Sequence, residues 1–144
     1  MRIWHYRLLP YLPELQFKGQ LRELVAIMHD WRDKGKTNHL LINRVMEYSK
    51  ADLASYFWYY HEQYSIRYKV EKMELVHEFI VFSELEPFRP RPFEGWHDDV
   101  YLRVCMANLY EKHFYGVGKS RISDDEWAVL TDGYKIITGE EYKI

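Results

Sequence analysis

Apolar positions recur at spacings of three and four residues from Leu12 to Lys34, which predicts one long amphipathic helix. Pro13 suits its first turn, where a missing N–H costs nothing, and Gly35 follows its end. The predicted core-facing side chains are Phe17, Leu21, Leu24, Met28 and Trp31. The opposite face carries Gln16, Gly19, Gln20, Glu23, Ala26 and Asp30. Its two small residues flank the glutamate, so a bulky ligand could approach the helix backbone there.

The segments on either side of this helix are shorter or less regular. Met1 to Leu9 is expected to be an extended arm or strand, because nearby prolines disfavour a helix. A short helix or an extended connector is predicted over residues 40–46. Ser49 with an acid three residues later is a capping box for a second helix. Its pattern continues to Glu84, and since so long a helix would be unusual, we expect a break between residues 60 and 66.

The second half of the chain begins with a proline-rich segment at residues 86–93. We interpret it as an extended connector, with a polyproline-type partner motif as the alternative. A helix is predicted from about His97 to Tyr115, with its core face formed by Val100, Val104, Met106, Ala107 and Leu109. Ser123 is expected to cap a short last helix ending near Leu130. Residues 134–144 alternate well enough to suggest a possible short β-hairpin.

Together these elements predict an all-α fold, a compact single-domain bundle of about three main helices with an N-terminal arm. Residues 1–116 would form the main helical domain, and residues 117–144 a small C-terminal extension packed on it. A length of 144 residues suits one domain with a modest core. The sequence has no apolar run long enough for a membrane span, and charged residues interrupt its start, so no signal peptide is expected. The single Cys105 excludes an internal disulfide framework and favours a cytoplasmic location.

A formal net charge of −2 argues against a general nucleic-acid binder. The distribution of charge changes that picture, because residues 1–44 hold eight basic and four acidic side chains. Residues 71–144 hold nine basic and fifteen acidic ones. A phosphate-binding face needs local positive charge, and the basic third contains the long first helix. An ordinary solvated surface is the alternative interpretation.

The amino terminus is the candidate nucleophile, because only a short segment separates it from the polar face of that helix. An α-amine has a pKa near 8, against about 10.4 for lysine, so an appreciable fraction is neutral at physiological pH. A neutral amine beside the Glu23 carboxylate is what imine formation at a sugar carbon requires. Arg2 is bulky, so we expect Met1 to be retained. The alternative is an inert terminus, since Arg22-Glu23 alone is a common dipeptide.

The N-terminal motifs are specific enough to compare with known families. They are Met1-Arg2-Ile3-Trp4-His5, the run Leu8–Pro13, Gln16, Gly19-Gln20 and Arg22-Glu23-Leu24. They resemble the pyrimidine-dimer DNA glycosylase/AP lyase family of the phage endonuclease V type, and its bacterial members most closely. A looser likeness continues through Gly35-Lys36, His39, Asn43, Tyr48-Ser49, Tyr56–His61 and Leu109–Gly116. The resemblance covers roughly residues 1–116.

This resemblance implies a DNA repair enzyme that acts on damaged bases, such as pyrimidine dimers, in double-stranded DNA. Met1 would supply the amine that forms the imine, and Glu23 would assist; no cofactor or metal is implied. The implied DNA-binding residues are Arg2, Gln16, Gln20, Arg22, Lys36, His39 and Lys112. No membrane partner is expected, and a monomer is favoured.

Some positions depart from the family. Ala26 stands where the phage-type enzymes carry a second helix arginine, and Asn108 where they carry another basic residue. The alternative is therefore a catalytically inactive helical protein that binds DNA or protein, and the lesion could equally be an abasic site or an oxidised base. The spacings of His5, His39, His61 and His113 match no metal-ligand motif. We expect His61 to be a hydrogen-bonded core or boundary residue and Tyr56–Tyr60 to serve packing.

Overall fold

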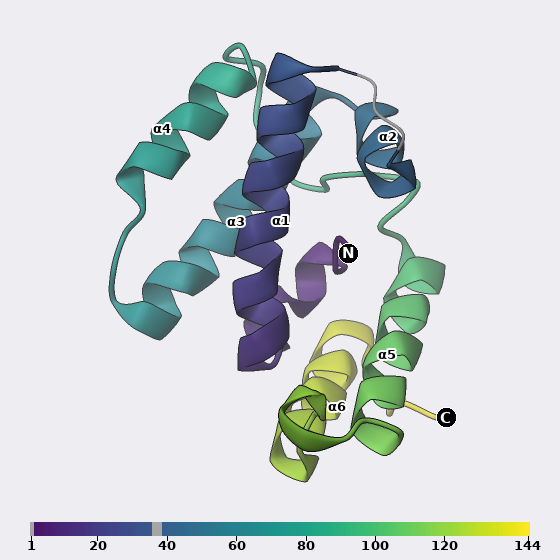
Figure 1. Ribbon diagram of the computed structural model, residues 1–144. Coiled ribbons are helices and arrows are strands. Elements are labelled where there is room, and N and C mark those ends of the chain that lie inside the picture. The colour runs from purple at the N-terminus through teal and green to yellow at the C-terminus, as the bar shows by residue number, and fades with distance from the viewer. Residues whose placement is uncertain (1, 36–38) are drawn as a thin grey trace.

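The computed structural model describes residues 2–35 and 39–144, and within them the fold is all-α (Figure 1). The elements, in chain order, are the 3-10 helix η1 (Tyr6–Tyr11), α1 (Glu14–Asp33), α2 (Leu40–Met46), α3 (Lys50–Tyr68), α4 (Met73–Phe82), α5 (Asp99–Phe114), the 3-10 helix η2 (Gly118–Ser120) and α6 (Asp124–Thr138). No helix of the described residues is long and apolar enough to cross a bilayer. The predicted fold class is confirmed, with four long helices where about three were expected.

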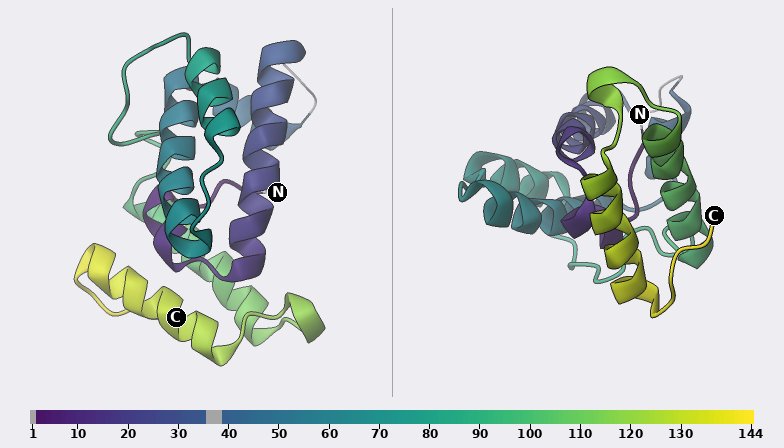
Figure 2. Two further views of the ribbon diagram at one scale, coloured as in Figure 1. Left: turned by 90° about the vertical axis from the view of Figure 1, so that its left-hand side faces the viewer. Right: turned by 90° about the horizontal axis from the view of Figure 1, so that it is seen from below.

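The helices form two groups joined through the N-terminal segment. α1 packs on α3 and α4, whereas α5 pairs with α6. Between them lies η1, which contacts both α3 and α6 (Figure 2). The described part of the arm, from residue 2, starts between α1 and α5, as Figure 1 shows. The arm therefore runs through the middle of the fold and contacts both groups.

The first long helix is confirmed, with one important difference on its polar face. Pro13 is the N-cap instead of a first-turn residue. Phe17, Leu24 and Met28 are fully buried as predicted. Gln20, expected on the open face, is also buried, with only 1% of its surface exposed. Gln20 lies on the same buried stripe as Phe17, Leu24, Ile27 and Met28, and the arm covers the helix there, so the buried stripe extends toward the arm.

The capping box of the second long helix is confirmed, because Ser49 Oγ accepts from the Asp52 amide and the Asp52 carboxylate accepts from the Ser49 amide. The break predicted within residues 60–66 is wrong. α3 continues to Tyr68 and ends at Lys69, which has a φ of 54°. Tyr56, Phe57 and Tyr60 are buried, so the core continues through the aromatic run and holds the helix together there.

His61 is a boundary residue, as predicted. It is 8% exposed, and its Nε2 accepts a hydrogen bond from the Lys72 amide at 2.9 Å. The proline-rich segment crosses the surface without regular structure. It is anchored by Phe93, which is fully buried and whose amide donates to Asp52 Oδ1 at 3.0 Å.

The core face of α5 differs from the prediction. Met106 and Leu109 are buried as expected, but Val100 and Val104 are 59% and 41% exposed and Ala107 is exposed. The buried row is Leu102, Cys105, Met106 and Leu109. Those four follow the helical spacing of three and four, so the prediction chose a neighbouring row of the same helix. The helix starts at Asp99 because the Asp98 side chain accepts from the Tyr101 amide.

The suggested hairpin is wrong, because α6 runs on to Thr138 and stops at Gly139, whose φ is 77°. Leu130 and Tyr134 are buried at helical spacing, which outweighs the weak alternation. Gly133 lets this helix approach η1 closely: a Cβ added there would lie 2.3 Å from Tyr11 Cγ. The C-terminal helix thus packs on the segment that carries the arm.

The arm itself is extended only over residues 2–5, and η1 follows, with Pro10 inside it. The expectation of an extended segment up to Leu9 is therefore wrong in its second half. The tighter 3-10 bonding starts at Leu8, whose amide donates to the His5 carbonyl at 2.9 Å. Leu8 and Leu9 are fully buried, so this turn contributes to the core.

Candidate active site

Glu23 lies in the middle of α1, beside the N-terminal arm. Its carboxylate atom Oε2 accepts a hydrogen bond from the Arg2 amide at 3.2 Å and another from Gln20 Nε2 at 3.1 Å. The side chain is half-buried, whereas the adjacent Arg22 is exposed. The arm was predicted to lie against the polar face of this helix, and from residue 2 onward it does so, with the Arg2 amide on the Glu23 carboxylate. Met1 lies outside the described residues.

Gln20 ties the arm to α1. Its Oε1 accepts from the Trp4 amide at 2.8 Å, and Tyr56 Oη, whose proton is shared with the closer Trp4 carbonyl, lies 3.0 Å from it. Its Nε2 donates to the Arg2 carbonyl at 3.0 Å as well as to Glu23. All the hydrogen-bonding atoms of this carboxamide have partners inside the protein. Gln20 therefore positions the arm against α1.

Two tyrosines and one histidine complete the support of the arm, and none of the three was predicted as a site residue. Tyr56 Oη donates to the Trp4 carbonyl at 2.5 Å, and Tyr101 Oη donates to the Ile3 carbonyl at 2.6 Å. His97 Nδ1 accepts from the Tyr6 amide at 3.3 Å. Their partners lie 52 to 98 residues away in the chain. No local sequence pattern could have shown these contacts.

His5 and His97 form a buried pair under the arm. The two rings stack with centroids 5.3 Å apart, and His5 Nε2 donates to the His97 carbonyl at 3.0 Å. His5 Nδ1 accepts from the Arg7 amide at 3.1 Å, so this ring is neutral with its proton on Nε2. Burial, followed by the charge of Arg7, lowers the pKa of His5 to about 4.

Burial raises the pKa of Glu23 above its ordinary value, and the Arg2 amide bond and the charge of Arg22 oppose that rise. A half-buried carboxylate with raised pKa is a better proton acceptor than an exposed one, because its basicity is higher. Since it lies next to exposed Arg22, it is also close to a group that can bind phosphate. The arrangement can therefore combine proton transfer with anion binding.

The remaining predicted DNA-binding residues lie at different places. Arg2 is half-buried, with its guanidinium 5.7 Å from the centre of the Trp4 ring. Gln16 is half-buried two turns before Glu23, and its Oε1 has no hydrogen-bond partner in the described part of the chain. It borders a cleft of about 310 Å³, and the basic side chains in the wall of this cleft are Lys18, Lys119 and Arg121. The cleft joins the first turns of α1 to η2.

His39 and Lys112 are both exposed, one as the N-cap of α2 and the other in the last turn of α5. They belong to elements other than α1, which carries Glu23, and Lys36 lies outside the described residues. Across residues 2–35 and 39–144, no three His, Cys, Asp or Glu side chains converge into a group that could hold a metal ion.

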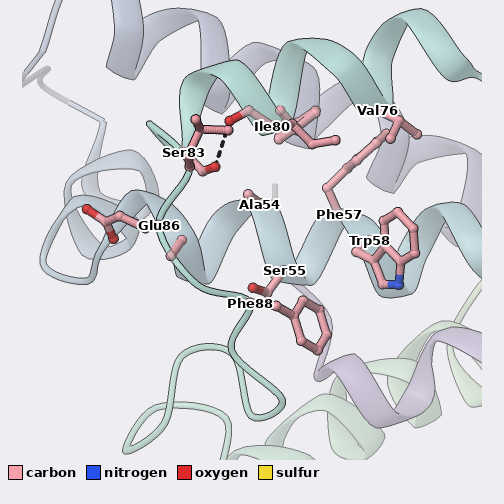
Figure 3. A pocket seen from close by; sticks show the side chains of 12 residues that line it. Ala54, Ser55, Phe57, Trp58, Val76, Ile80, Ser83, Glu86 and Phe88 are labelled. Carbon is pink, nitrogen blue, oxygen red and sulfur yellow. Dashed lines mark hydrogen bonds between the residues drawn. The ribbon is translucent and has the colours of Figure 1, made fainter.

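The most apolar cavity lies elsewhere. It is a space of about 490 Å³ between α3, α4 and the segment after α4, with Phe57, Val76 and Ile80 in its wall and Trp58 and Phe88 at its edge (Figure 3). The Ser83 hydroxyl there donates to the Ile80 carbonyl at 2.7 Å. Glu86 is its one carboxylate, and Glu23 takes no part in the lining. Pocket shape therefore does not identify the candidate active site, whereas the chemistry on α1 does.

One comparison with known proteins covers the part of the chain that contains α1. A model of the family described as pyrimidine dimer DNA glycosylase matches residues 1–74, which include the arm, Gln20, Arg22, Glu23 and Tyr56. No curated protein and no solved structure matches the chain. From this match over half of its length, we conclude that the chain belongs to the pyrimidine dimer DNA glycosylase family.

Proposed function

We propose that this protein is a DNA repair glycosylase with AP lyase activity, which acts on damaged bases such as pyrimidine dimers through an imine formed by the Met1 amine. Family membership supports the glycosylase activity and a DNA substrate. The bond from the Arg2 amide to Glu23 Oε2 supports the proposed chemistry, since it fixes residue 2 at the carboxylate. Met1 directly precedes Arg2, and one residue spans about 3.8 Å. The Met1 amine would therefore lie within about that distance of the Arg2 amide.

In the proposed reaction, the neutral amine attacks C1′ of the damaged nucleotide. The bond from C1′ to the base breaks, and the base leaves with the electron pair and takes up a proton. The nitrogen loses a proton to Glu23, and as the C1′–O4′ bond breaks this proton passes to O4′, which leaves a protonated imine. The Glu23 carboxylate then accepts the C2′ proton, and the electrons of that C–H bond expel the 3′ phosphate by β-elimination. A positioned acid or base of this kind contributes about 10²–10⁴-fold to the rate.

The basic side chains have a separate function in this proposal. Arg2 and Arg22 flank the carboxylate and would bind phosphates near the lesion, while Lys36, His39 and Lys112 would contact the backbone farther away. Gln16 borders the cleft at the start of α1 and would hold the neighbouring base or backbone. Access to C1′ requires a nucleotide to leave the stack, which costs a few kcal/mol and is easiest at a damaged site.

The test is a borohydride trapping experiment with untagged protein that begins at Met1. A duplex with a pyrimidine dimer, or one with an abasic site, is incubated with the protein and reduced, and the product is mapped by mass spectrometry. We expect a covalent adduct on the N-terminal peptide. Adding two residues before Met1 should abolish it, and the substitution Glu23→Gln should slow its formation by about 10²–10⁴-fold. Glu14→Gln, an exposed position on the same helix, is the matched control and should leave it intact.

The second candidate is a catalytically inactive helical protein that binds DNA or protein. The net charge of −2 and the exposed Ala26 favour it, because both weaken phosphate binding. A protein that binds the damaged duplex at neutral pH and low salt, yet yields no adduct with either substrate, would belong to this class. A cytoplasmic, monomeric protein is part of both proposals.

A further inference from the structure

The arm is held by side chains instead of by a neighbouring strand. An extended segment must satisfy each of its buried main-chain N–H and C=O groups, and strands do so by pairing. Here Gln20, Glu23, Tyr56, Tyr101 and His97 bind the polar main-chain atoms of residues 2–6. The arm's place along α1 therefore depends on these side chains.

Tyr56 and Tyr101 have complementary positions in this set. They bind the carbonyls of two successive residues, Trp4 and Ile3. Neighbouring carbonyls of an extended chain point to opposite sides, so α3 holds the arm from one side and α5 from the other. The Ile3 side chain is fully buried between these bonds. A slip of one residue would bury Arg2 in its place, so the register of the arm is fixed.

On the α5 side, Tyr101 binds the arm close to its first described residue. Its hydroxyl bonds the residue directly after Arg2, whose amide lies on Glu23. Burial raises the pKa of Tyr101, so the hydroxyl remains a donor throughout the neutral range. Tyr101 also lies outside residues 1–74, the part of the chain that the family model matches.

We propose that Tyr101 is a positioning residue for the imine chemistry: its bond to the Ile3 carbonyl holds the start of the chain against Glu23. This inference rests on the proposed function. It means that a helix outside the matched region completes the site. Tyr101 acts through the arm and does not contact the DNA.

The substitution Tyr101→Phe removes only the hydroxyl and leaves the Ile3 carbonyl without its donor. We expect single-turnover adduct formation on an abasic duplex to slow by roughly 10- to 100-fold, the range that corresponds to losing the partner of a buried polar group. The dissociation constant for an uncleavable abasic analogue should stay within about threefold. Tyr110→Phe is the matched control, because Tyr110 lies on the same helix and its hydroxyl makes no hydrogen bond within the described residues. It should leave the rate unchanged.

A slowed rate with unchanged affinity supports the positioning role. An unchanged rate, or a loss of affinity as large as the loss of rate, overturns it. Tyr56→Phe releases the neighbouring carbonyl on the opposite side and should slow the reaction in the same way, so it provides an independent test if Tyr101→Phe is unstable.

A second measurement separates this inference from the proposed function. Hydrogen exchange of the Arg2, Trp4 and Tyr6 amides needs no DNA, and Tyr101→Phe should accelerate it at least tenfold while Tyr110→Phe should not. If wild-type protein forms no adduct but this acceleration occurs, the proposed function fails and the positioning of the arm stands. If the exchange rates of the two variants are equal, the inference about Tyr101 fails whatever the activity is.

Discussion

The main-chain amide of Arg2 donates a hydrogen bond to Glu23 Oε2 at 3.2 Å, across 21 positions of sequence. A main-chain bond does not depend on the side chain at position 2, so the carboxylate is held by the arm itself. A glutamine at position 23 could still accept this bond through its amide oxygen. Glu23→Gln therefore tests the charge and basicity of the carboxylate while keeping the arm in place.

For Glu23→Gln we expect duplex binding within a fewfold of wild type and adduct formation slower by about 10²–10⁴-fold, because the proton acceptor is lost. Binding is measured by fluorescence anisotropy, and the adduct by single-turnover trapping. Equal rates for this variant and wild type would contradict the role given to Glu23.

The pH dependence of the reaction should show the raised pKa of Glu23. Because burial raises that pKa above 4.5, the carboxylate becomes protonated at a higher pH than an exposed glutamate does. The acidic limb of the rate profile for β-elimination should consequently have its midpoint above pH 4.5. A profile that remains flat down to pH 4.5 would exclude Glu23 as the proton acceptor.

Gln20→Ala should reduce stability and activity together. It removes the acceptor of the buried Trp4 amide and the donor to the Arg2 carbonyl. We expect a loss of about 2–3 kcal/mol in the free energy of unfolding, measured with urea. Gln63→Ala on α3, where the glutamine is half-buried and its side chain makes no hydrogen bond within the described residues, should change it by less than about 0.5 kcal/mol. Similar losses in the two variants would mean that Gln20 does not hold the arm.

His5 should make the protein less stable in mild acid. Its pKa is about 4 in the folded state and about 6.5 when exposed, so between these values the unfolded state binds more protons. Above pH 6.5 the neutral ring makes its full contribution to the free energy of unfolding. As the pH falls toward 4, the free energy of unfolding decreases by about 3 kcal/mol. Urea unfolding at pH 7, 5.5 and 4 measures this. His5→Asn should flatten the slope, while a substitution of exposed His77 should preserve it.

Ala26→Arg should strengthen DNA binding. Position 26 is exposed one turn after Arg22, so a new guanidinium would extend the basic side of α1. We expect the slope of log affinity against log salt to become steeper by about one, as for one added phosphate contact. Ala26→Gln is the uncharged control. An unchanged slope would place the DNA away from this part of α1.

The sequence predicted the helices better than it predicted the site. Caps such as Ser49 with Asp52, and the stripe of Phe17, Leu24 and Met28, depend on neighbours within a few residues, so the pattern contains them. The α5 face was chosen wrongly because two rows of that helix are apolar, and only its packing partners distinguish them. The length of α6 was missed because its helical spacing competed with a weak alternation.

The site was predicted in part, for the same reason. Glu23 and Arg22 follow from the motif on one helix, which the family match includes. Gln20 was expected to face DNA, yet it faces the arm, because the burial of a polar side chain is decided by a segment that folds over it. Tyr101 and His97 were not foreseen, since they reach the arm from more than 90 residues away.

The support of the arm also sets an order of assembly. Residues 2–6 leave the ribosome early, but Ile3 and Tyr6 have partners in residues that are synthesised 98 and 91 positions later. Since domains generally fold from the N-terminal side during synthesis, α1 and α3 can form while the arm still lacks its α5 contacts. A nascent chain that ends before α5 therefore lacks these contacts, and in the proposed function its Met1 amine would become competent only after α5 has been synthesised.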